Sequence, residues 1–167
     1  IPGSLVGSEM CIRDRDWHPV TQATFAFGYG LSASPLQLAR AYGVLANNGL
    51  KKDIKLLLDE GETNVSRVFS SDLSKTVNNM LESVVSESGT GKNAMIPHYR
   101  VAGKTATLHK VKAGGGYDEN KYVSAFAGFS PASNPRVVTV VIIDEPSEGK
   151  YFGGLVAAPI FSKVTER

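Results

Sequence analysis

The sequence has few of the residues that build disulfides, metal centres or membrane spans. Its 167 residues include one cysteine, Cys11, which excludes an intrachain disulfide and a cysteine-based zinc site. The three histidines, His18, His98 and His109, are scattered without ligand spacing, so we expect no metal site. The longest apolar run, from 137 to 143, is interrupted by Thr139 and is far shorter than the roughly 18 residues that a membrane-spanning helix requires.

A strong charge of one sign is also missing. The 18 Lys and Arg residues nearly balance the 16 Asp and Glu residues, and the net charge of +2 gives no electrostatic reason to expect nucleic-acid binding. The hydrophobic fraction of 42% argues against a disordered chain. A chain of 167 residues is long enough for one domain with a buried core.

The first fifteen residues differ from the rest of the sequence. They read IPGSLVGSEMCIRDR, with neither a helical nor a strand period and without the pattern of a signal peptide. We predict that residues 1–15 are a non-native segment and that the domain occupies residues 17–167.

The rest of the chain contains helix and strand patterns with clear boundaries. Ser34-Pro35 places a capping serine before a proline at the first helical position, and Pro159 is expected to kink the last helix. The predicted segments are helices at 34–47, from 70 or 71 to 86, and 155–165, and strands at 54–58, 100–108, 123–129 and 136–143. The last strand is apolar on both faces, which is typical of a central strand. Three successive strands with short connections predict an α+β fold, with an antiparallel sheet flanked by helices.

Two motifs are weak when they are taken alone. The run from Gly28 to Ala33 fits a dinucleotide-binding pattern and Asp53 follows it, but the alternating strand and helix units of that fold are absent. Ser147 and Lys150 have the S-x-x-K spacing of serine acyltransferases. They follow Pro146 and enclose Gly149, so we expect a solvated loop rather than the helix that this chemistry requires.

The tetrapeptide Lys104-Thr-Ala-Thr107 is more informative. In a strand, Lys104 and Ala106 lie on one face while Thr105 and Thr107 lie on the other. Small and hydroxyl side chains beside a lysine leave the backbone open to an extended ligand that pairs as an extra strand. An ordinary amphipathic strand would give the same four residues.

Four separate blocks form a more specific pattern. The blocks are Phe25-Ala-Phe-Gly-Tyr-Gly-Leu with Ser34-Pro-Leu-Gln-Leu-Ala-Arg-Ala-Tyr42 and Leu45-Ala-Asn-Asn-Gly49; Gly89-Thr-Gly with Tyr99-Arg-Val-Ala-Gly-Lys-Thr105; Phe126-Ala-Gly-Phe-Ser-Pro131; and Asp144-Glu-Pro146 with Tyr151-Phe-Gly-Gly-Leu-Val-Ala-Ala-Pro159. Together they resemble class B penicillin-binding proteins, and their order and spacing resemble the division-specific (septal) D,D-transpeptidases of Gram-negative bacteria. The resemblance extends over about residues 17–167.

This family has three active-site motifs, of which the sequence contains one. Lys104 to Thr107 matches K-[ST]-G-T, whereas S-x-N and a helical S-x-x-K with the acylated serine are absent. The resemblance therefore implies the C-terminal half of a penicillin-binding transpeptidase domain, without its N-terminal strands and nucleophile helix. We expect this chain alone to be inactive.

The resemblance assigns roles to eight residues. Lys104 supports proton movement and attracts the substrate carboxylate, the Thr105 and Thr107 hydroxyls bind that carboxylate, and the Thr107 backbone N–H is an oxyanion-hole donor. Ala106 stands where the family has glycine, and its methyl group narrows the substrate slot. The remaining substrate-binding positions are His109, near the ligand carboxylate, and the aromatic residues Tyr117, Tyr151 and Phe152. An exposed histidine at a strand end would explain His109 equally well.

The implied reaction is acyl transfer from the D-Ala-D-Ala end of a peptidoglycan stem peptide, with neither a metal nor an organic cofactor. β-Lactams acylate the same serine. The implied partners are stem peptides, β-lactams and, through the parent chain, other division proteins. The implied location is the periplasmic face of the inner membrane, reached through an anchor outside this chain. Two alternatives stay open: a non-catalytic interaction module of the same fold, which Ala106 would allow, and a nucleotide-binding protein.

Overall fold

The computed structural model describes residues 32–55, 61–112, 116–147 and 149–166, together with the single positions 19 and 23. Several predictions fall wholly or partly on other residues: the segment 1–15, most of the run from 28 to 33, the end of the strand predicted at 54–58, and Glu148 in the S-x-x-K spacing. These lie outside the described residues. The elements below all belong to the unit that begins at Ser34.

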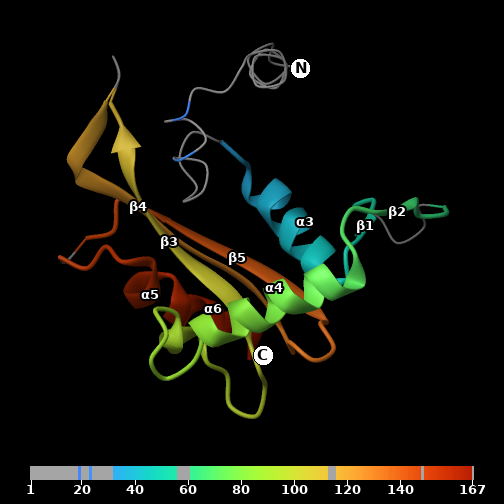
Figure 1. Ribbon diagram of the computed structural model, residues 1–167. Helices are drawn as coiled ribbons and strands as arrows, with labels where there is room; N and C mark the ends of the chain where they lie inside the picture. Colours follow the sequence, from blue (N-terminus) through green and yellow to red (C-terminus); the bar gives the residue numbers. More distant parts are fainter. Residues whose placement is uncertain are drawn as a thin grey trace. The chain divides into compact units, whose positions relative to one another are not determined.

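The larger of the two described sheets is antiparallel and has three strands (Figure 1). The strands are β3 (Ala102–Val111), β4 (Tyr117–Ser130) and β5 (Val137–Asp144), and their order in space is β3-β4-β5. The flanking helices are α3 (Pro35–Ala46), α4 (Ser71–Val84), α5 (Gly153–Val156) and α6 (Ala158–Thr165), with a short 3₁₀ turn, η1 (Lys92–Ala94). The predicted α+β class, with an antiparallel sheet flanked by helices, is confirmed.

The two long helices begin where the sequence predicts. The Ser34 hydroxyl accepts the Gln37 backbone N–H and the Gln37 side chain accepts the Ser34 N–H, which is a complete capping box. Ser70 caps α4 with one bond, since its hydroxyl accepts the Leu73 N–H at 3.1 Å. Such caps stabilise a helix by about 1 kcal/mol each.

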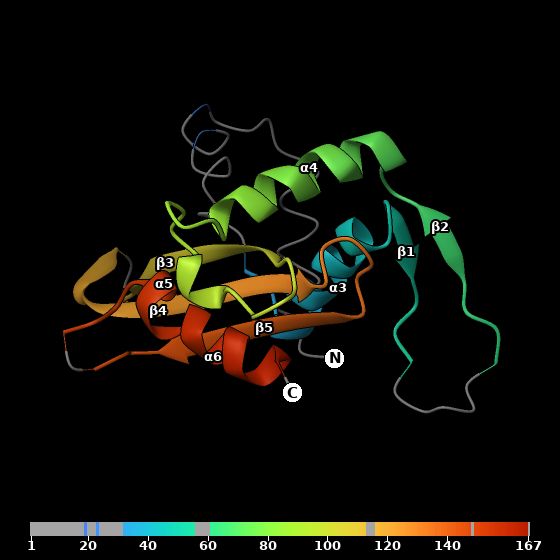
Figure 2. The same ribbon diagram turned by 90° about the horizontal axis from the view of Figure 1, so that it is seen from below.

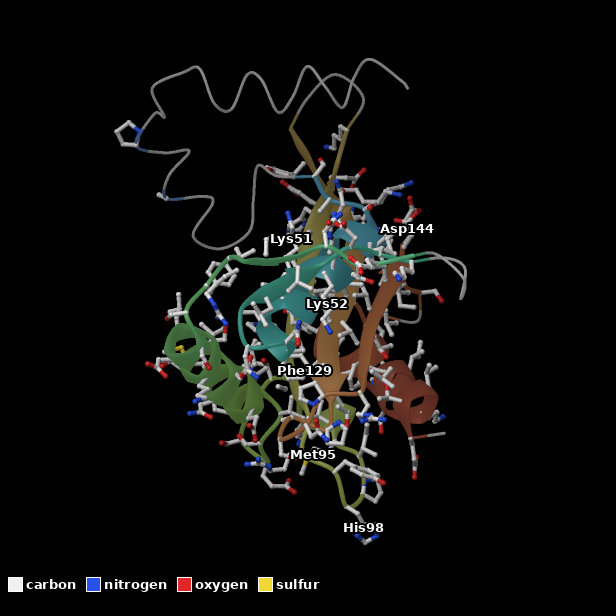
Figure 3. The ribbon with its side chains drawn as sticks, turned by 90° about the vertical axis from the view of Figure 1, so that its right-hand side faces the viewer. Lys51, Lys52, Met95, His98, Phe129 and Asp144 are labelled. Carbon is white, nitrogen blue, oxygen red and sulfur yellow. The ribbon has the colours of Figure 1, made fainter. Side chains whose placement is uncertain are left out.

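The second half of β4, the middle strand, is buried on both faces. On one face Phe126 packs against Phe161 of α6 with ring centroids 4.7 Å apart, and both side chains are fully buried. Full burial of one such ring contributes about 1.5–3 kcal/mol. By alternation Ala127 and Phe129 point to the opposite face, and they are buried as well. Figure 2 shows α4 and α6 on opposite sides of the sheet, and in Figure 3 Phe129 and Asp144 lie toward its opposite ends.

Four predicted element positions were wrong in detail. Among the described residues β4 is the middle strand, and β5 lies at an edge with side chains that are half-buried or exposed. Residues 54 and 55 of the strand predicted at 54–58 are not in a strand, and the strand nearest to them is β1 (Leu50–Lys52), paired with an unpredicted β2 (Val65–Arg67). The final helix begins at Gly153 rather than Leu155, and it is divided at Ala157, near the expected kink, because Pro159 has no N–H to continue it. β3 and β4 extend to Val111 and Tyr117, which pair with each other beyond an irregularity in the ladder.

Candidate active site

The outer edge of β3 presents unpaired backbone groups. The Glu145 N–H donates to the Tyr122 carbonyl at 2.9 Å, so β4 bonds to β5 through Tyr122 and every second residue after it. The alternate β4 residues therefore bond to β3, where Ala125 pairs with Ala106 and Ala127 with Lys104. It follows that Thr105 and Thr107 direct their N–H and C=O groups away from β4. Among the described residues no strand pairs with this edge.

Lys104 lies at this edge and is exposed. Its ammonium donates to the Thr105 carbonyl at 3.0 Å and lies 3.3 Å from the Thr105 hydroxyl. This contact agrees with the pairing pattern, which directs the Thr105 carbonyl away from β4. The Lys104 ammonium thus lies next to the backbone groups with which an incoming extended ligand would pair.

A pocket of about 350 Å³ opens beside the same edge. The loop before β3 forms one wall and the start of α5 forms the other. The lining residues are Gly89, Thr90, Lys92, Asn93, Thr105, Thr107, Phe152, Gly153, Gly154 and Leu155. The walls meet closely, because the Asn93 amide donates to the Gly154 carbonyl at 2.8 Å and a Cβ on Gly154 would lie 2.2 Å from the Thr90 carbonyl oxygen.

The pocket has more hydrogen-bond donors than the protein uses. The Thr107 hydroxyl oxygen accepts the Gly153 N–H at 3.0 Å, and no described acceptor takes its own proton. The Thr90 and Thr105 hydroxyls lie 3.2 Å apart, so one donates to the other and the second keeps a proton to donate elsewhere. None of the described lining residues is acidic. A group that only accepts hydrogen bonds, such as a carboxylate, satisfies this arrangement.

A row of aromatic rings connects the far end of β3 with the pocket. The ring centroids of His109 and Tyr122 are 4.6 Å apart, those of Tyr122 and Tyr151 are 4.1 Å apart and nearly parallel, and those of Tyr151 and Phe152 are 4.5 Å apart. Phe152 is 54% exposed and lines the pocket, so the row ends in an open apolar rim. Burial at the stacked position raises the pKa of the Tyr122 phenol.

Tyr122 was missed by the sequence analysis, which named Tyr117. The structure places Tyr117 at the start of β4, opposite Val111 and 51% exposed, whereas Tyr122 is opposite His109. The signal that separates them is strand register, because Tyr122 pairs with His109, whereas Tyr117 pairs with Val111 beyond an irregularity in the ladder.

His109 and Ala106 occupy the places that alternation predicts. His109 lies on the face of Thr105 and Thr107, and its Nδ1 is 2.9 Å from the Asp118 carbonyl oxygen. Since a carbonyl only accepts, Nδ1 carries the proton and Nε2 is the remaining polar atom. Ala106 is exposed on the Lys104 face. The roles assigned to these residues stay predictions, as does the Thr107 N–H as an oxyanion donor.

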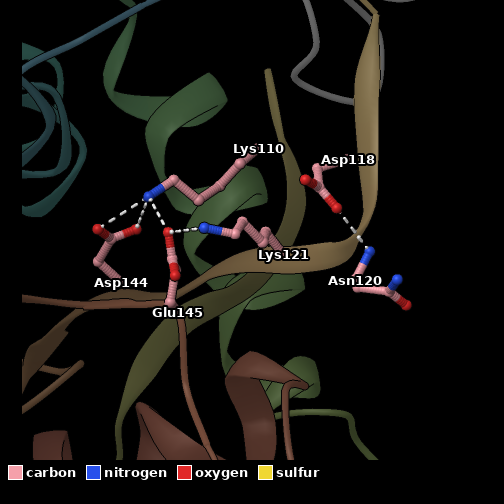
Figure 4. A network of polar contacts seen from close by, with 6 residues as sticks. All are labelled: Lys110, Asp118, Asn120, Lys121, Asp144 and Glu145. Carbon is pink, nitrogen blue, oxygen red and sulfur yellow. Dashed lines mark hydrogen bonds and ion pairs between the residues drawn. The ribbon is translucent and has the colours of Figure 1, made fainter. Parts of the chain in front are cut away.

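A charged network that the sequence analysis did not find joins all three strands (Figure 4). The Lys110 ammonium lies 3.0 Å from an Asp144 oxygen and 2.8 Å from a Glu145 oxygen, and Lys121 lies 3.2 Å from the same Glu145 oxygen. The Glu145 contact, followed by Asp144, raises the pKa of Lys110. The Lys110 contact, followed by Lys121, lowers the pKa of Glu145. The network lies at the end of β5.

The remaining motifs do not form sites in the described residues. Ser147, Gly149 and Lys150 are exposed and non-helical, as predicted. The Asp53 carboxylate is bound by Arg40 at 3.1 Å and Asn64 at 2.9 Å. All described strand pairs are antiparallel, so the described residues do not contain the parallel unit that a dinucleotide fold requires. The described part of the chain has no cluster of possible metal ligands and no helix long and apolar enough to cross a membrane.

The chain belongs to the penicillin binding protein transpeptidase domain family, whose model matches residues 4–166. The predicted resemblance is therefore confirmed. The match begins inside the segment 1–15, whose non-native origin stays a prediction.

Two curated relatives and one solved structure define the likeness more closely. The peptidoglycan D,D-transpeptidase FtsI of Escherichia coli strain K12 is 43% identical over 148 residues, which are 89% of this chain and 25% of that protein. The FtsI of Buchnera aphidicola subsp. Baizongia pistaciae is 43% identical over 159 residues, 92% of this chain and 27% of that protein. The transpeptidase domain of Burkholderia pseudomallei penicillin-binding protein 3 superposes with a TM-score of 0.80 at 45% identity, over 89% of this chain and 45% of that one. The chain thus spans about a quarter of the length of these curated relatives.

Proposed function

We propose that this chain is part of a septal peptidoglycan D,D-transpeptidase and supplies the substrate-binding edge of its active site. In the proposed reaction a serine from outside this chain attacks the D-Ala-D-Ala amide carbonyl. The terminal D-Ala leaves with the proton, and an amine of a neighbouring stem peptide then displaces the serine to form the cross-link. β-Lactams acylate the same serine.

The observation that carries this proposal is the outward edge of β3 beside the donor-rich pocket. An extended stem peptide would pair with the outward groups of Thr105 and Thr107, in the manner of an added strand. Its terminal carboxylate would accept from the spare hydroxyl protons and from Lys104. The Thr107 N–H would then face the developing oxyanion, a type of contact whose loss typically costs about 10²–10³ in rate.

The proposed function also implies a location and partners. Peptidoglycan lies outside the inner membrane, so the domain would work on the periplasmic face, held by an anchor that is not in this chain. Other division proteins would act through the rest of the parent protein. No metal or organic cofactor takes part in the proposed reaction.

A chimera tests the proposal. Residues 34–166 would replace the matching segment of the Escherichia coli relative, and labelling by fluorescent penicillin would be measured on the purified, folded protein. We expect a labelled chimera, strongly reduced labelling after Lys104→Ala, and unchanged labelling after Lys163→Ala, which removes an exposed lysine of α6. Wild-type labelling in the Lys104→Ala chimera would contradict the role of this edge.

A second candidate is a non-catalytic interaction module of the same fold. The observation in its favour is Ala106, whose methyl group lies on the Lys104 face where the family has glycine. A folded chimera that penicillin does not label, even after Ala106→Gly, would favour this module over the enzyme.

A further inference from the structure

Among the described residues that line the pocket beside β3, Lys92 is the only charged one. It belongs to η1, on the wall opposite Thr105 and Thr107, and its side chain is exposed. The described residues give it no ion pair and no side-chain hydrogen bond. Its positive charge is therefore balanced only by solvent when the pocket is empty.

The backbone that carries Lys92 is firmly held. The Gly91 N–H donates to the Val84 carbonyl and the Ala94 N–H to the Gly91 carbonyl, both at 2.8 Å, and Ala94 is fully buried. The neighbouring Asn93 side chain ties the turn to Gly154. The Lys92 ammonium therefore moves only by rotation of its own side chain, from a fixed origin on the pocket wall.

The charges around the pocket all favour an anion. Lys104 approaches Thr105 from the strand edge, and Lys92 is on the opposite wall. Between them the hydroxyls of Thr90, Thr105 and Thr107 leave at least two protons to donate. The two cations repel a cationic ligand. None of the described lining residues is acidic, so the pocket offers donors rather than acceptors, and the N–H groups of a neutral amide would be poorly satisfied there.

We propose that Lys92 is a specificity-determining residue, which selects ligands whose pocket-facing end carries a carboxylate. This inference rests on the proposed function, since it concerns the same pocket, and adds a residue from the loop before β3 to the recognition of the ligand. The Lys92 charge also raises the rate at which anionic ligands associate.

The test uses the ¹⁵N-labelled 167-residue chain and two probes, N-acetyl-D-alanyl-D-alanine and its C-terminal amide. Amide shifts of Thr105, Thr107 and Gly153 would give the dissociation constants. We expect Lys92→Met to weaken binding of the acid by about threefold to tenfold at low salt and to leave the amide unchanged, as for one charge-assisted contact at an exposed site. The difference should shrink at about 0.5 M salt.

Two matched variants complete the experiment. Lys92→Arg keeps the charge and should keep the preference for the acid, whereas Lys163→Met removes an exposed lysine of α6 and should change neither affinity. Equal affinity of wild type and Lys92→Met for the acid, together with weaker binding by Lys104→Met, would overturn the inference and leave the proposed function standing. Failure of the wild-type chain to bind the acid at these residues would overturn both.

Discussion

Substitution of Gly153 by alanine should displace the proposed substrate-binding edge although no residue assigned to that edge is mutated. Gly153 begins α5 directly against the sheet. A Cβ there would lie 2.4 Å from the carbonyl oxygens of Ala106 and Ala125, which face each other across β3 and β4. Both atoms belong to the backbone, so no side-chain rotation relieves the clash. The helix or the strands must move by roughly half an ångström or more to reach the 3.0 Å below which real Cβ contacts essentially do not occur.

The energetic cost follows from two contacts. Overpacking of this kind costs about 1–3 kcal/mol, and lifting α5 breaks the bond from the Gly153 N–H to the Thr107 hydroxyl, worth about 1 kcal/mol. The lower entropy of the unfolded alanine chain offsets about 0.4–1 kcal/mol. A net loss of about 1–3 kcal/mol corresponds to a fall in Tm of roughly 3–12 °C for a domain of this size.

Thermal unfolding and the amide shift of Thr107 would measure the two consequences. The control is Gly43→Ala in α3, where an added Cβ meets nothing within 4 Å and removal of a helix glycine should stabilise by about 0.5–1 kcal/mol. If Gly153→Ala unfolds at the wild-type temperature and leaves the Thr107 amide in place, the tight contact between α5 and β3 is not real.

Three further predictions concern acylation and pH. The chain alone should form no covalent adduct with fluorescent penicillin, because its single S-x-x-K spacing, at Ser147, is non-helical; an intact-mass adduct on any serine would refute this. Ala106→Gly in the chimera should raise the second-order rate of β-lactam acylation, since about 1 Å of misplacement can cost roughly 100-fold, and an unchanged or slower rate would contradict the steric account. The folded state lowers the pKa of Glu145, so its stabilising contribution should be complete above about pH 5 and lost as the pH falls through the folded pKa. Wild type and Glu145→Gln should therefore differ in Tm at pH 7 and converge once the pH is below the folded pKa, with a smaller difference in high salt; a difference that persists when the carboxyl is protonated in both states would exclude this cause.

Local signals explain which parts of the fold could be predicted. Ser34 with Gln37, and Ser70 before α4, are caps whose chemistry is complete within four residues, and both helices begin there. Lys104 to Thr107 alternates as a strand does, and the structure confirms the strand. In contrast, β1 and β2 have three residues each, and β1 begins directly after the turn at Gly49. The φ of 83° at Gly49, and the bonds that its carbonyl accepts from the Val68 and Phe69 N–H groups, are set by tertiary packing.

The candidate site was predicted less completely because much of it depends on distances between segments. The partners of the Thr90 hydroxyl and the Asn93 amide are 15 and 61 residues away along the chain, so no local pattern indicates them. Tyr122 and Tyr117 are equally aromatic and lie on one strand. Tyr122 pairs with His109, whereas Tyr117 pairs with Val111 on the other side of a bulge. This pairing decides which of the two rings joins the row of aromatic residues.

Hydropathy and hydrogen bonding therefore carry different information about a strand, and the two edges of this sheet illustrate it. β5 is apolar on both faces and would be assigned to the middle of a sheet, yet β4 lies there and β5 has a free edge among the described residues. β3 has a free edge as well, but its Lys104, Thr105 and Thr107 add a cation and spare donors, and the pocket opens beside them. A backbone edge becomes a candidate binding site when side chains of one polarity gather next to it, because the edge alone offers the same N–H and C=O groups to any extended chain. On that criterion β3, and not β5, is the edge where an anionic peptide would bind.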